Sequence, residues 1–326
     1  MLNGRSVLVT GGTGSFGQKF VETVLQQYEP RRLIILSRDE LKQYEMQQVK
    51  SPVENPCLRY FLGDVRDKDR LYRAFYGVDL VVHAAALKQV PAAEYNPFEV
   101  VQTNIIGTQN VIDAAIDNGV QKVIALSTDK AVNPVNLYGA TKLCLERLVV
   151  AANSYAGGRT KFSVVRYGNV VGSRGSVVPV FLKQKKAHVL TVTDERMTRF
   201  WITLEQGVSF VLGCLENMQG GEVFVPKIPS MRIIDLARTV CPHCRIQFIG
   251  VRPGEKLHEL LISKDEARNV VDHGDYFVVK PSFPFWKSKV EQQGRPVPEE
   301  WEYASNTNEQ WLEKDRLQEL IEQLTD

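Results

Sequence analysis

The chain has 326 residues, 44% of them hydrophobic, which is enough to bury one large core or a main core with a smaller satellite. This composition excludes fibrous and disordered proteins. Lysine and arginine total 40 against 38 aspartates and glutamates, with no long block of one sign, so nucleic acid is not an expected partner. No apolar stretch is long enough to span a bilayer and no signal-peptide pattern precedes the first strand, so we expect a cytoplasmic protein without membrane contact.

Short apolar runs alternate with helix-like segments in the first half of the chain. Predicted strands cover residues 6–10, 32–37, 58–64, 79–86, 122–128 and 161–167, and predicted helices lie between them at residues 15–28, 39–48, 67–75, 97–118 and 137–156. Continuous apolar strands separated by helices are typical of a parallel sheet covered on both faces. We therefore expect an α/β fold with a doubly wound sheet that binds ligands at the carboxyl ends of its strands.

A glycine-rich loop follows the first predicted strand. Gly11, Gly14 and Gly17 form a G-x-x-G-x-x-G frame at the start of the first helix, where glycines let backbone amides approach a pyrophosphate. A structural turn is the alternative, but the strand-turn-helix context favours dinucleotide binding. The residues expected to line the cofactor here are Gly11, Thr13, Gly14, Ser15, Phe16 and Gly17.

The end of the second strand favours NADP over NAD. Ser37 and Arg38 come first, with Lys42 one helical turn on, and a guanidinium can hold a 2′-phosphate with paired donors. Asp39 leaves two roles open, because it could cap the next helix or accept the ribose hydroxyl of NAD. Further cofactor contacts are expected from Asp64 and Val65 at the adenine and from Ala84, Ala85 and Ala86, which offer a flat surface.

Tyr138 and Lys142 are one helical turn apart and therefore share a face of the predicted helix. A nearby ammonium favours the phenolate, so we expect a tyrosine pKa lowered from about 10, which suits a base that takes a hydroxyl proton as hydride leaves. An exposed, unrelated pair is the alternative. The glycine loop upstream favours the dehydrogenase-type interpretation, and Tyr138 and Lys142 are then also cofactor contacts.

Thr128-Asp129-Lys130, a short way before Tyr138, lies at the end of the fifth predicted strand. Considered alone, it is a solvated turn in which Asp129 caps a helix and Lys130 points to water. Beside the tyrosine and lysine, at a strand's carboxyl end, the placement rule for open sheets favours a functional role.

These motifs resemble those of a known family. "GGTGSFG", "SRDELKQ", "GDVRD", "HAAALKQVPAAEYNP", "STDKAVNPVNLYGATK", "MTRFWI" and "RPGEKLHE" are similar to stretches of the extended short-chain dehydrogenases/reductases (SDR), and within them of the inverting UDP-N-acetylglucosamine 4,6-dehydratases that open the pseudaminic acid pathway. The Asp-Lys pair ahead of Tyr-x-x-x-Lys is the specific mark of that family.

The resemblance implies a hydro-lyase with an internal redox cycle on UDP-N-acetylglucosamine. Oxidation at C4 acidifies the C5 hydrogen, which Lys130 would remove if burial or other cations depress its pKa. Asp129 would protonate the departing 6-hydroxyl, and Thr128 would bind the 4-oxygen. Hydride would return to C6, and reprotonation would invert C5, giving UDP-2-acetamido-2,6-dideoxy-β-L-arabino-hex-4-ulose. Tyr138 is one possible C5 donor.

The resemblance also suggests substrate contacts. Guanidinium groups bind phosphate oxygens in pairs, which makes Arg199 and Arg252 candidates for the nucleotide-sugar pyrophosphate. Asn169 resembles the family's contact to the diphosphate region, Glu255 is a candidate for the ribose or for orienting Arg252, and Lys88 is expected to face the sugar. Rival functions are an epimerase or a 5,6-ene-forming dehydratase of the superfamily, and a non-catalytic NADP-binding protein.

After Arg166 the alternation weakens into Gly/Pro-punctuated segments. We expect residues 1–168, with about 201–226, to form an NADP-binding Rossmann domain, and residues 169–200 and 227–326 to form a smaller substrate-binding region with a helical tail. Leu317, Leu320, Ile321 and Leu324 share a face of that tail, which favours docking on its own domain over a subunit contact. A hexamer is expected from resemblance alone.

Five cysteines are present, and only Cys241 and Cys244 are close in sequence. A zinc site would need two more ligands nearby, and His243 and His258 lack a finger-like spacing. We therefore expect structural or incidental thiols and no metal site.

Overall fold

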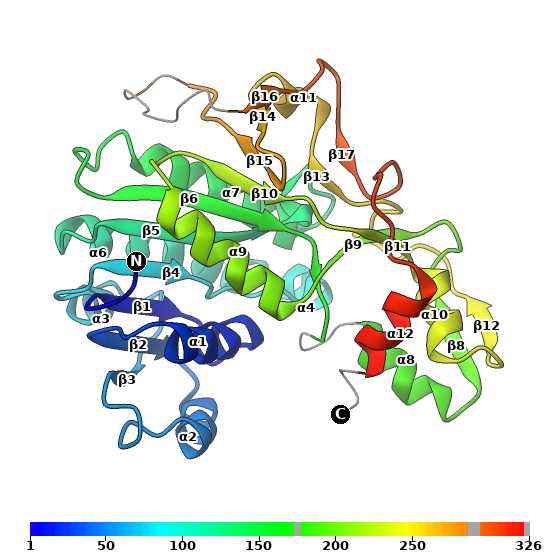
Figure 1. The fold of residues 1–326 in the computed structure, drawn as a ribbon, viewed down its shortest axis with the longest axis horizontal. Coiled ribbons are helices and arrows are strands. Elements are labelled where there is room, and N and C mark those ends of the chain that lie inside the picture. The colour runs from blue at the N-terminus through cyan, green and yellow to red at the C-terminus, as the bar shows by residue number, and fades with distance from the viewer. Residues whose placement is uncertain (173–176, 284, 286–293, 323–326) are drawn as a thin grey trace.

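The computed structural model describes residues 1–172, 177–283, 285 and 294–322, and a ten-stranded sheet forms the body of the molecule (Figure 1). Its strand order is β16-β14-β15-β10-β6-β5-β4-β1-β2-β3. The strands from β3 to β10 in that order are parallel: β1 (Ser6–Thr10), β2 (Arg32–Ser37), β3 (Leu58–Leu62), β4 (Leu80–His83), β5 (Lys122–Thr128), β6 (Lys161–Tyr167) and β10 (Val223–Pro226). Antiparallel strands β15 (Tyr276–Val279), β14 (Val270–Asp272) and β16 (Arg295–Pro296) extend the edge.

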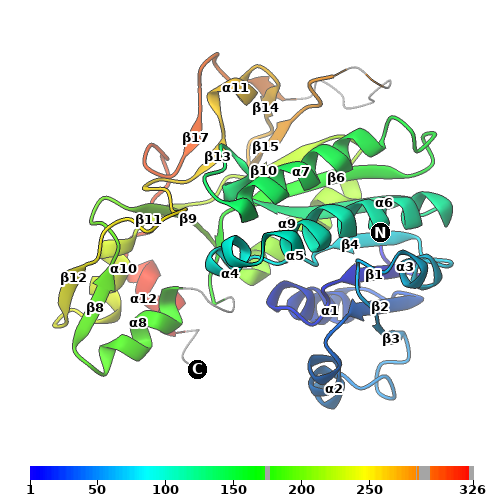
Figure 2. The same cartoon turned by 180° about the vertical axis from the view of Figure 1, so that it is seen from behind.

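Helices cover both faces of this sheet, which confirms the doubly wound α/β prediction. One face carries α1 (Ser15–Gln27) and α9 (Leu204–Asn217), seen in front in Figure 1. The other carries α3 (Lys68–Ala74), α6 (Gly107–Asp117) and α7 (Leu137–Ala152), in front in Figure 2. Because both faces are covered, a central strand such as β1 is buried along its whole length, as its "SVLVT" sequence requires.

Shorter helices connect these elements, and α4 (Val90–Tyr95) and α5 (Pro97–Val101) pack against α7. α2 (Glu40–Val49) follows β2, and α4 is a short helix that the sequence did not predict. The predicted helix 97–118 is present, but its α-helical hydrogen-bond pattern is interrupted. α5 leads through a π-helical turn at Gln102–Ile106 into α6. No described helix is long and apolar enough to cross a membrane.

A second, smaller hydrophobic core lies beside the sheet. It gathers α8 (Val177–Lys185), β8 (Val189–Val192), α10 (Ile233–Val240), β12 (Arg245–Phe248) and α12 (Lys314–Glu322). Leu317 and Ile321 of α12 are buried in this core, so the tail packs on its own chain. Leu324 lies outside the described residues.

Short strands join the two cores. β9 (Thr198–Ile202) lies between β7 (Asn169–Val170) and β11 (Ser230–Arg232), and β13 (Leu260–Ile262) pairs with β17 (Tyr303–Ala304). α9 and β10, from residues 204–226, belong to the large sheet layer, and so do β14 and β15 from the last third of the chain. The division of the chain into two domains stays a prediction.

A fully buried arginine fastens the later segments to the parallel sheet. Arg166 on β6 donates to both carboxylate oxygens of Glu146 on α7, at 3.0 and 2.7 Å, and to both oxygens of Glu266, at 3.1 and 2.9 Å. Glu266 lies on α11 (Lys264–Ala267), directly after β13. Paired donors in a fixed plane give such contacts geometric specificity, and removing one partner would leave a buried charge. The network therefore fixes the position of α11, and of β13 directly before it, relative to β6.

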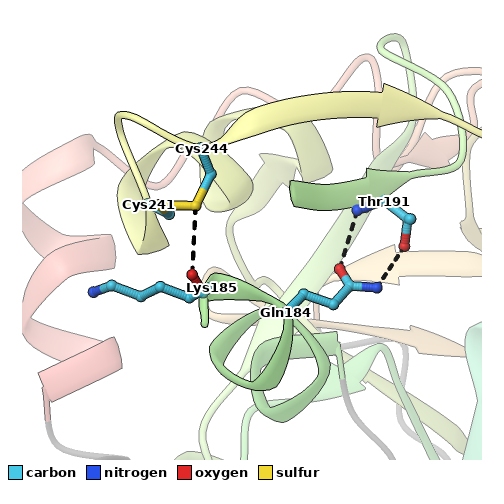
Figure 3. Close-up of a disulfide and its surroundings, with 5 residues drawn as sticks. All are labelled: Gln184, Lys185, Thr191, Cys241 and Cys244. Atoms are coloured by element: carbon cyan, nitrogen blue, oxygen red, sulfur yellow. Dashed lines mark hydrogen bonds between the residues drawn. A yellow bond between two sulfur atoms is a disulfide. The ribbon is translucent and has the colours of Figure 1, made fainter. Parts of the chain in front are cut away.

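Cys241 and Cys244 form a disulfide at the end of α10, within the smaller core (Figure 3). The prediction of thiols is wrong for this pair, because sequence spacing did not show that the turn after α10 brings the two sulfur atoms together. Cys57, Cys144 and Cys214 are free. Among the described residues, no group of three or more His, Cys, Asp or Glu side chains is placed to hold a metal ion.

Candidate active site

The glycine loop forms a cradle that no larger residue could line. Gly11 has a left-handed φ of 66°, and a Cβ built on it would lie 2.9 Å from the backbone nitrogen of Ala85. A Cβ on Gly17 would lie 2.5 Å from the Cα of Gly12. Gly14 is the N-cap of α1 and contributes no side-chain cap, so the helix N-terminus stays open to an anion. The loop fits a dinucleotide pyrophosphate.

Side chains around the loop hold it against β2. The hydroxyls of Thr13 and Ser37 are 2.8 Å apart and buried. Ser15 begins α1, and the Phe16 ring next to it stacks on Phe20 with ring centroids 6.0 Å apart.

The end of β2 carries two cations with acidic partners. Asp39 caps α2 by accepting a hydrogen bond from the backbone N–H of Lys42 at 3.0 Å. Of the two roles that the sequence left open for Asp39, the structure therefore shows the helix cap. Lys42 Nζ also pairs with the Asp39 carboxylate. Arg38 is half-exposed and lies 3.5 Å from Asp64, whose stronger partner is Arg66 at 2.8 Å. Burial acts to raise the pKa of Asp64, but the hydrogen bonds and charge of Arg66 outweigh it, so the net shift is downward.

The segment that follows β4 is held in place by a buried histidine, His83, that the sequence analysis missed. The backbone N–H groups of Ala84 and Ala85 donate to Thr10 Oγ1, both at 3.2 Å, and Thr10 is 2.8 Å from His83 Nδ1. Burial lowers the pKa of His83 to about 3, so its ring is neutral. This chain of contacts fixes the backbone of Ala84 and Ala85 beside Gly11.

Val65 lies in the loop that follows β3. Its side chain is buried and its carbonyl accepts from Asn110 Nδ2 at 3.0 Å. Asp64 and Val65 are therefore held at the end of β3, where the adenine was expected.

Tyr138 and Lys142 lie one turn apart on α7 and are both buried. Lys142 Nζ donates to the carbonyl of Leu126 at 2.6 Å, and burial lowers the pKa of Lys142 to about 8. Burial raises the pKa of Tyr138 to about 12, although the charge of Lys130 and a hydrogen bond with Thr128 act to lower it. The expected lowering of the tyrosine pKa is therefore wrong for this structure, because desolvation outweighs the neighbouring charge.

Asp129 and Lys130 form a single 3₁₀ turn after β5 and are not a solvated turn. Asp129 is fully buried, and its Oδ1 accepts from Thr128 Oγ1 and from Lys130 Nζ, both at 2.9 Å. Burial acts to lower the pKa of Lys130, but the charges of Asp129 and Glu259 raise it more, so the net shift is upward. The expected depression of the Lys130 pKa is therefore wrong, because two carboxylates lie beside the ammonium.

Three of the expected substrate contacts gather at this pair. Asn169 Oδ1 is 3.5 Å from Lys130 Nζ, and Arg199 Nε is 3.8 Å from Glu259, which itself contacts Lys130. Burial and the charge of Lys130 lower the pKa of Lys88.

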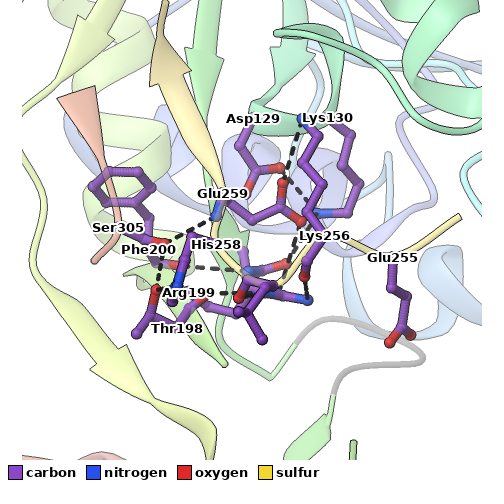
Figure 4. Close-up of polar contacts among 12 residues, drawn as sticks. Asp129, Lys130, Thr198, Arg199, Phe200, Glu255, Lys256, His258, Glu259 and Ser305 are labelled. Atoms are coloured by element: carbon purple, nitrogen blue, oxygen red, sulfur yellow. Dashed lines mark hydrogen bonds and ion pairs between the residues drawn. The ribbon is translucent and has the colours of Figure 1, made fainter. Parts of the chain in front are cut away.

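The other two expected substrate contacts lie apart from Lys130. Arg252 and Glu255 pair with each other at 3.7 Å, and the Arg252 side chain is 60% exposed. Figure 4 shows Glu255 pointing away from the cluster around Lys130.

Glu259 and Lys256 complete the cluster and were missed, although the motif "RPGEKLHE" contains both. Glu259 Oε1 lies 3.3 Å from Lys130 Nζ, and Lys256 Nζ lies 3.9 Å from Glu259 Oε2. Their spacing of three residues indicates that the two side chains can pair with each other. Nothing in the local sequence shows that they contact the turn at Asp129–Ala131, which comes from the first half of the chain.

A family model described as polysaccharide biosynthesis protein matches residues 7–281, and a relative from Campylobacter jejuni named UDP-N-acetylglucosamine 4,6-dehydratase (inverting) is 53% identical over 98% of each chain. The chain belongs to this family. The resemblance drawn from the motifs is thereby confirmed. A relative from Rickettsia conorii named UDP-glucose 4-epimerase is 43% identical, over 84% of this chain and 82% of its own.

Solved structures share the fold. The X-ray structure of Pen from Bacillus thuringiensis matches with a TM-score of 0.90 and 38% identity, covering 99% of both chains. DesIV, a dTDP-glucose 4,6-dehydratase from Streptomyces venezuelae with NAD bound, matches with a TM-score of 0.67 over 77% of this chain and 86% of its own. At 23% identity this second match shows the fold alone.

A glycine sets the distance between α7 and the 3₁₀ turn at Asp129–Ala131. A Cβ on Gly139 would collide with the backbone carbonyl oxygen of Lys130. Gly139→Ala should therefore lower the free energy of unfolding by about 1–3 kcal/mol, measured by urea denaturation, because α7 must move away. Gly213, inside α9 with open space around it, is the matched control. Gly213→Ala should stabilise by about 0.5–1 kcal/mol. Equal midpoints for the two variants would contradict this packing account.

Proposed function

We propose that the protein is a C5-inverting UDP-N-acetylglucosamine 4,6-dehydratase, a hydro-lyase that uses NADP in an internal redox cycle. One observation carries the proposal: a buried Asp129–Lys130 ion pair lies at the carboxyl end of β5, with Tyr138 beside it. An enzyme that only oxidises a sugar has no need of this buried acid and amine. The 53% identity to a relative of that name supports the assignment.

In the first step, Tyr138 takes the proton of the sugar 4-hydroxyl while hydride leaves C4. The bound cofactor supplies the hydride acceptor, and the positive charge of its oxidised ring favours the phenolate. The charge of Lys130 and the hydrogen bond with Thr128 also favour the phenolate, because both act to lower the Tyr138 pKa that burial raises. Lys142 is bound to the Leu126 carbonyl, where it fixes the helix face that carries Tyr138.

In the second step, a proton leaves C5 and hydroxide leaves C6 as water. The short Lys130–Asp129 contact lets one N–H bond break and one O–H bond form within the pair. The pair then consists of a neutral amine, which removes the C5 proton, and a neutral acid, which protonates the leaving 6-hydroxyl. Base and acid are thus generated together, although the ammonium itself has a raised pKa.

In the last step, the hydride returns to C6 of the 4-keto-5,6-ene and C5 receives a proton on the opposite face. The two protons lost from the 4-hydroxyl and C5 balance the two gained by water and C5, so the cofactor ends as it began. Tyr138, which holds the first proton, is the proposed donor.

The substrate-binding assignments follow the same chemistry. The Arg199 guanidinium donates to the carbonyls of Thr198, Leu257 and Lys256, at 2.7, 3.1 and 3.0 Å, which fixes its plane, and its remaining N–H groups are proposed to contact the pyrophosphate. Lys88 and Asn169 are proposed to face the sugar, and Arg252 with Glu255 to meet the nucleotide end. The pseudaminic acid pathway, the hexamer and the cytoplasmic location stay predictions.

Proton NMR of UDP-N-acetylglucosamine in D2O with purified protein tests the function. A new C6 methyl signal, deuterium at C5 and an L-configured ring are expected without added reductant. Lys130→Ala should abolish these signals, because the C5 base is gone, whereas Lys68→Ala, at an exposed ion pair, should leave them intact.

The 43% identity to an epimerase makes epimerisation the second candidate. Formation of the C4 epimer without a methyl signal, in both the natural chain and Lys130→Ala, would replace the dehydratase proposal. Accumulating 5,6-alkene would show a reaction that stops before hydride return.

The choice of NADP rests on Arg38 and Lys42 at the end of β2. Arg38→Ala should weaken NADP binding by about tenfold or more in calorimetry while leaving NAD affinity nearly unchanged, because only NADP carries the 2′-phosphate. Arg73→Ala, an exposed position on α3, is the control. Equal losses for both cofactors would favour NAD as the natural one.

A further inference from the structure

Glu259 is a buried carboxylate that enters the site from the second half of the chain. It directly precedes β13 and is 2% exposed. Its backbone N–H donates to Ser305 Oγ at 2.9 Å, and its carbonyl accepts from the Ser305 N–H at 2.8 Å. These bonds to the β17 side hold the Glu259 backbone, so its carboxylate position is set by the pairing of β13 with β17.

The carboxylate of Glu259 faces three cations and no solvent. Oε1 lies 3.3 Å from Lys130 Nζ and 3.8 Å from Arg199 Nε, and Oε2 lies 3.9 Å from Lys256 Nζ (Figure 4). Oε2 is buried and accepts no hydrogen bond. A carboxylate in such a place is costly unless nearby positive charge compensates it.

The groups facing Lys130 come from every neighbouring element. Asp129 and Glu259 are anionic, Arg199, Lys88 and Lys256 are cationic, and Tyr138 is the neighbouring phenol. Of these, only Asp129 and Glu259 pair with the Lys130 ammonium, one on its own turn and one from β13.

We propose that Glu259 is a positioning residue for Lys130: its charge holds the ammonium beside Asp129 and keeps the Lys130 proton from escaping to solvent. This inference rests on the proposed dehydratase mechanism. With Glu259 charged, Lys130 loses its proton favourably only by passing it to Asp129, so the amine base and the carboxylic acid form as a pair. Without that charge, Lys130 can lose its proton to water while Asp129 remains anionic, which gives a base without its acid.

The pH dependence of turnover tests this inference. The mechanism needs the one proton that the pair shares, so the rate falls at the pH at which Lys130 loses that proton to water, and removing a nearby negative charge lowers this pH. Glu259→Gln should therefore move the basic limb to lower pH by about 1 unit or more and lower the maximal rate. Glu259→Asp, which keeps the charge, should shift the limb less. Ser305→Ala, which loosens the same segment without changing any charge, should leave the limb in place.

A second readout does not need activity. The rate at which acetic anhydride labels Lys130, measured across pH by peptide mass spectrometry, reports the neutral amine directly. Labelling that begins at lower pH in Glu259→Gln than in the natural chain supports the inference, and an unchanged labelling profile would overturn it. If the labelling shifts but the natural chain leaves UDP-N-acetylglucosamine unchanged, the proposed function fails while the role of Glu259 on Lys130 stands.

Discussion

The ion pair between Asp129 and Lys130 is the interaction on which the rest of the site depends. Asp129 is fully buried at the end of a central parallel strand and the Lys130 side chain is 23% exposed, so other groups must help to keep both charges in place. Thr128 bonds the acid, and Glu259 pairs with the amine. In the proposed mechanism, this arrangement lets the two ionised side chains share one movable proton. An elimination needs such a unit, because a C–H and a C–O bond break on neighbouring carbons.

The fold delivers the parts of this unit from distant stretches of sequence. β5 supplies the Asp-Lys turn, α7 brings Tyr138 against it with Gly139 at the contact, and β13 brings Glu259. Arg166 fastens α7 and α11 to β6. The large sheet therefore positions Tyr138 and Lys142, which we propose for the redox step, and the short strands between the two cores position Glu259, which we propose to act on the Lys130 proton.

Local pattern was enough for much of this architecture. The predicted strands and the glycine loop follow from short-range signals, namely apolar runs, glycine spacing and the one-turn separation of Tyr138 and Lys142. The π-helical turn did not follow, because it depends on Asn104 exchanging hydrogen bonds with the backbone of Leu87. The upward shift of the Lys130 pKa could not be predicted either, since it reflects the balance of burial against the charges of Asp129 and Glu259, and Glu259 lies far along the chain.

In the proposed cycle, hydride leaves C4 of the sugar and returns to C6 within one active site. UDP-N-acetylglucosamine carrying deuterium at C4 tests this directly, in ordinary water and without added cofactor. NMR and mass spectrometry should find the deuterium in the C6 methyl group of the product. Deuterium restored to C4 or lost to solvent would contradict it.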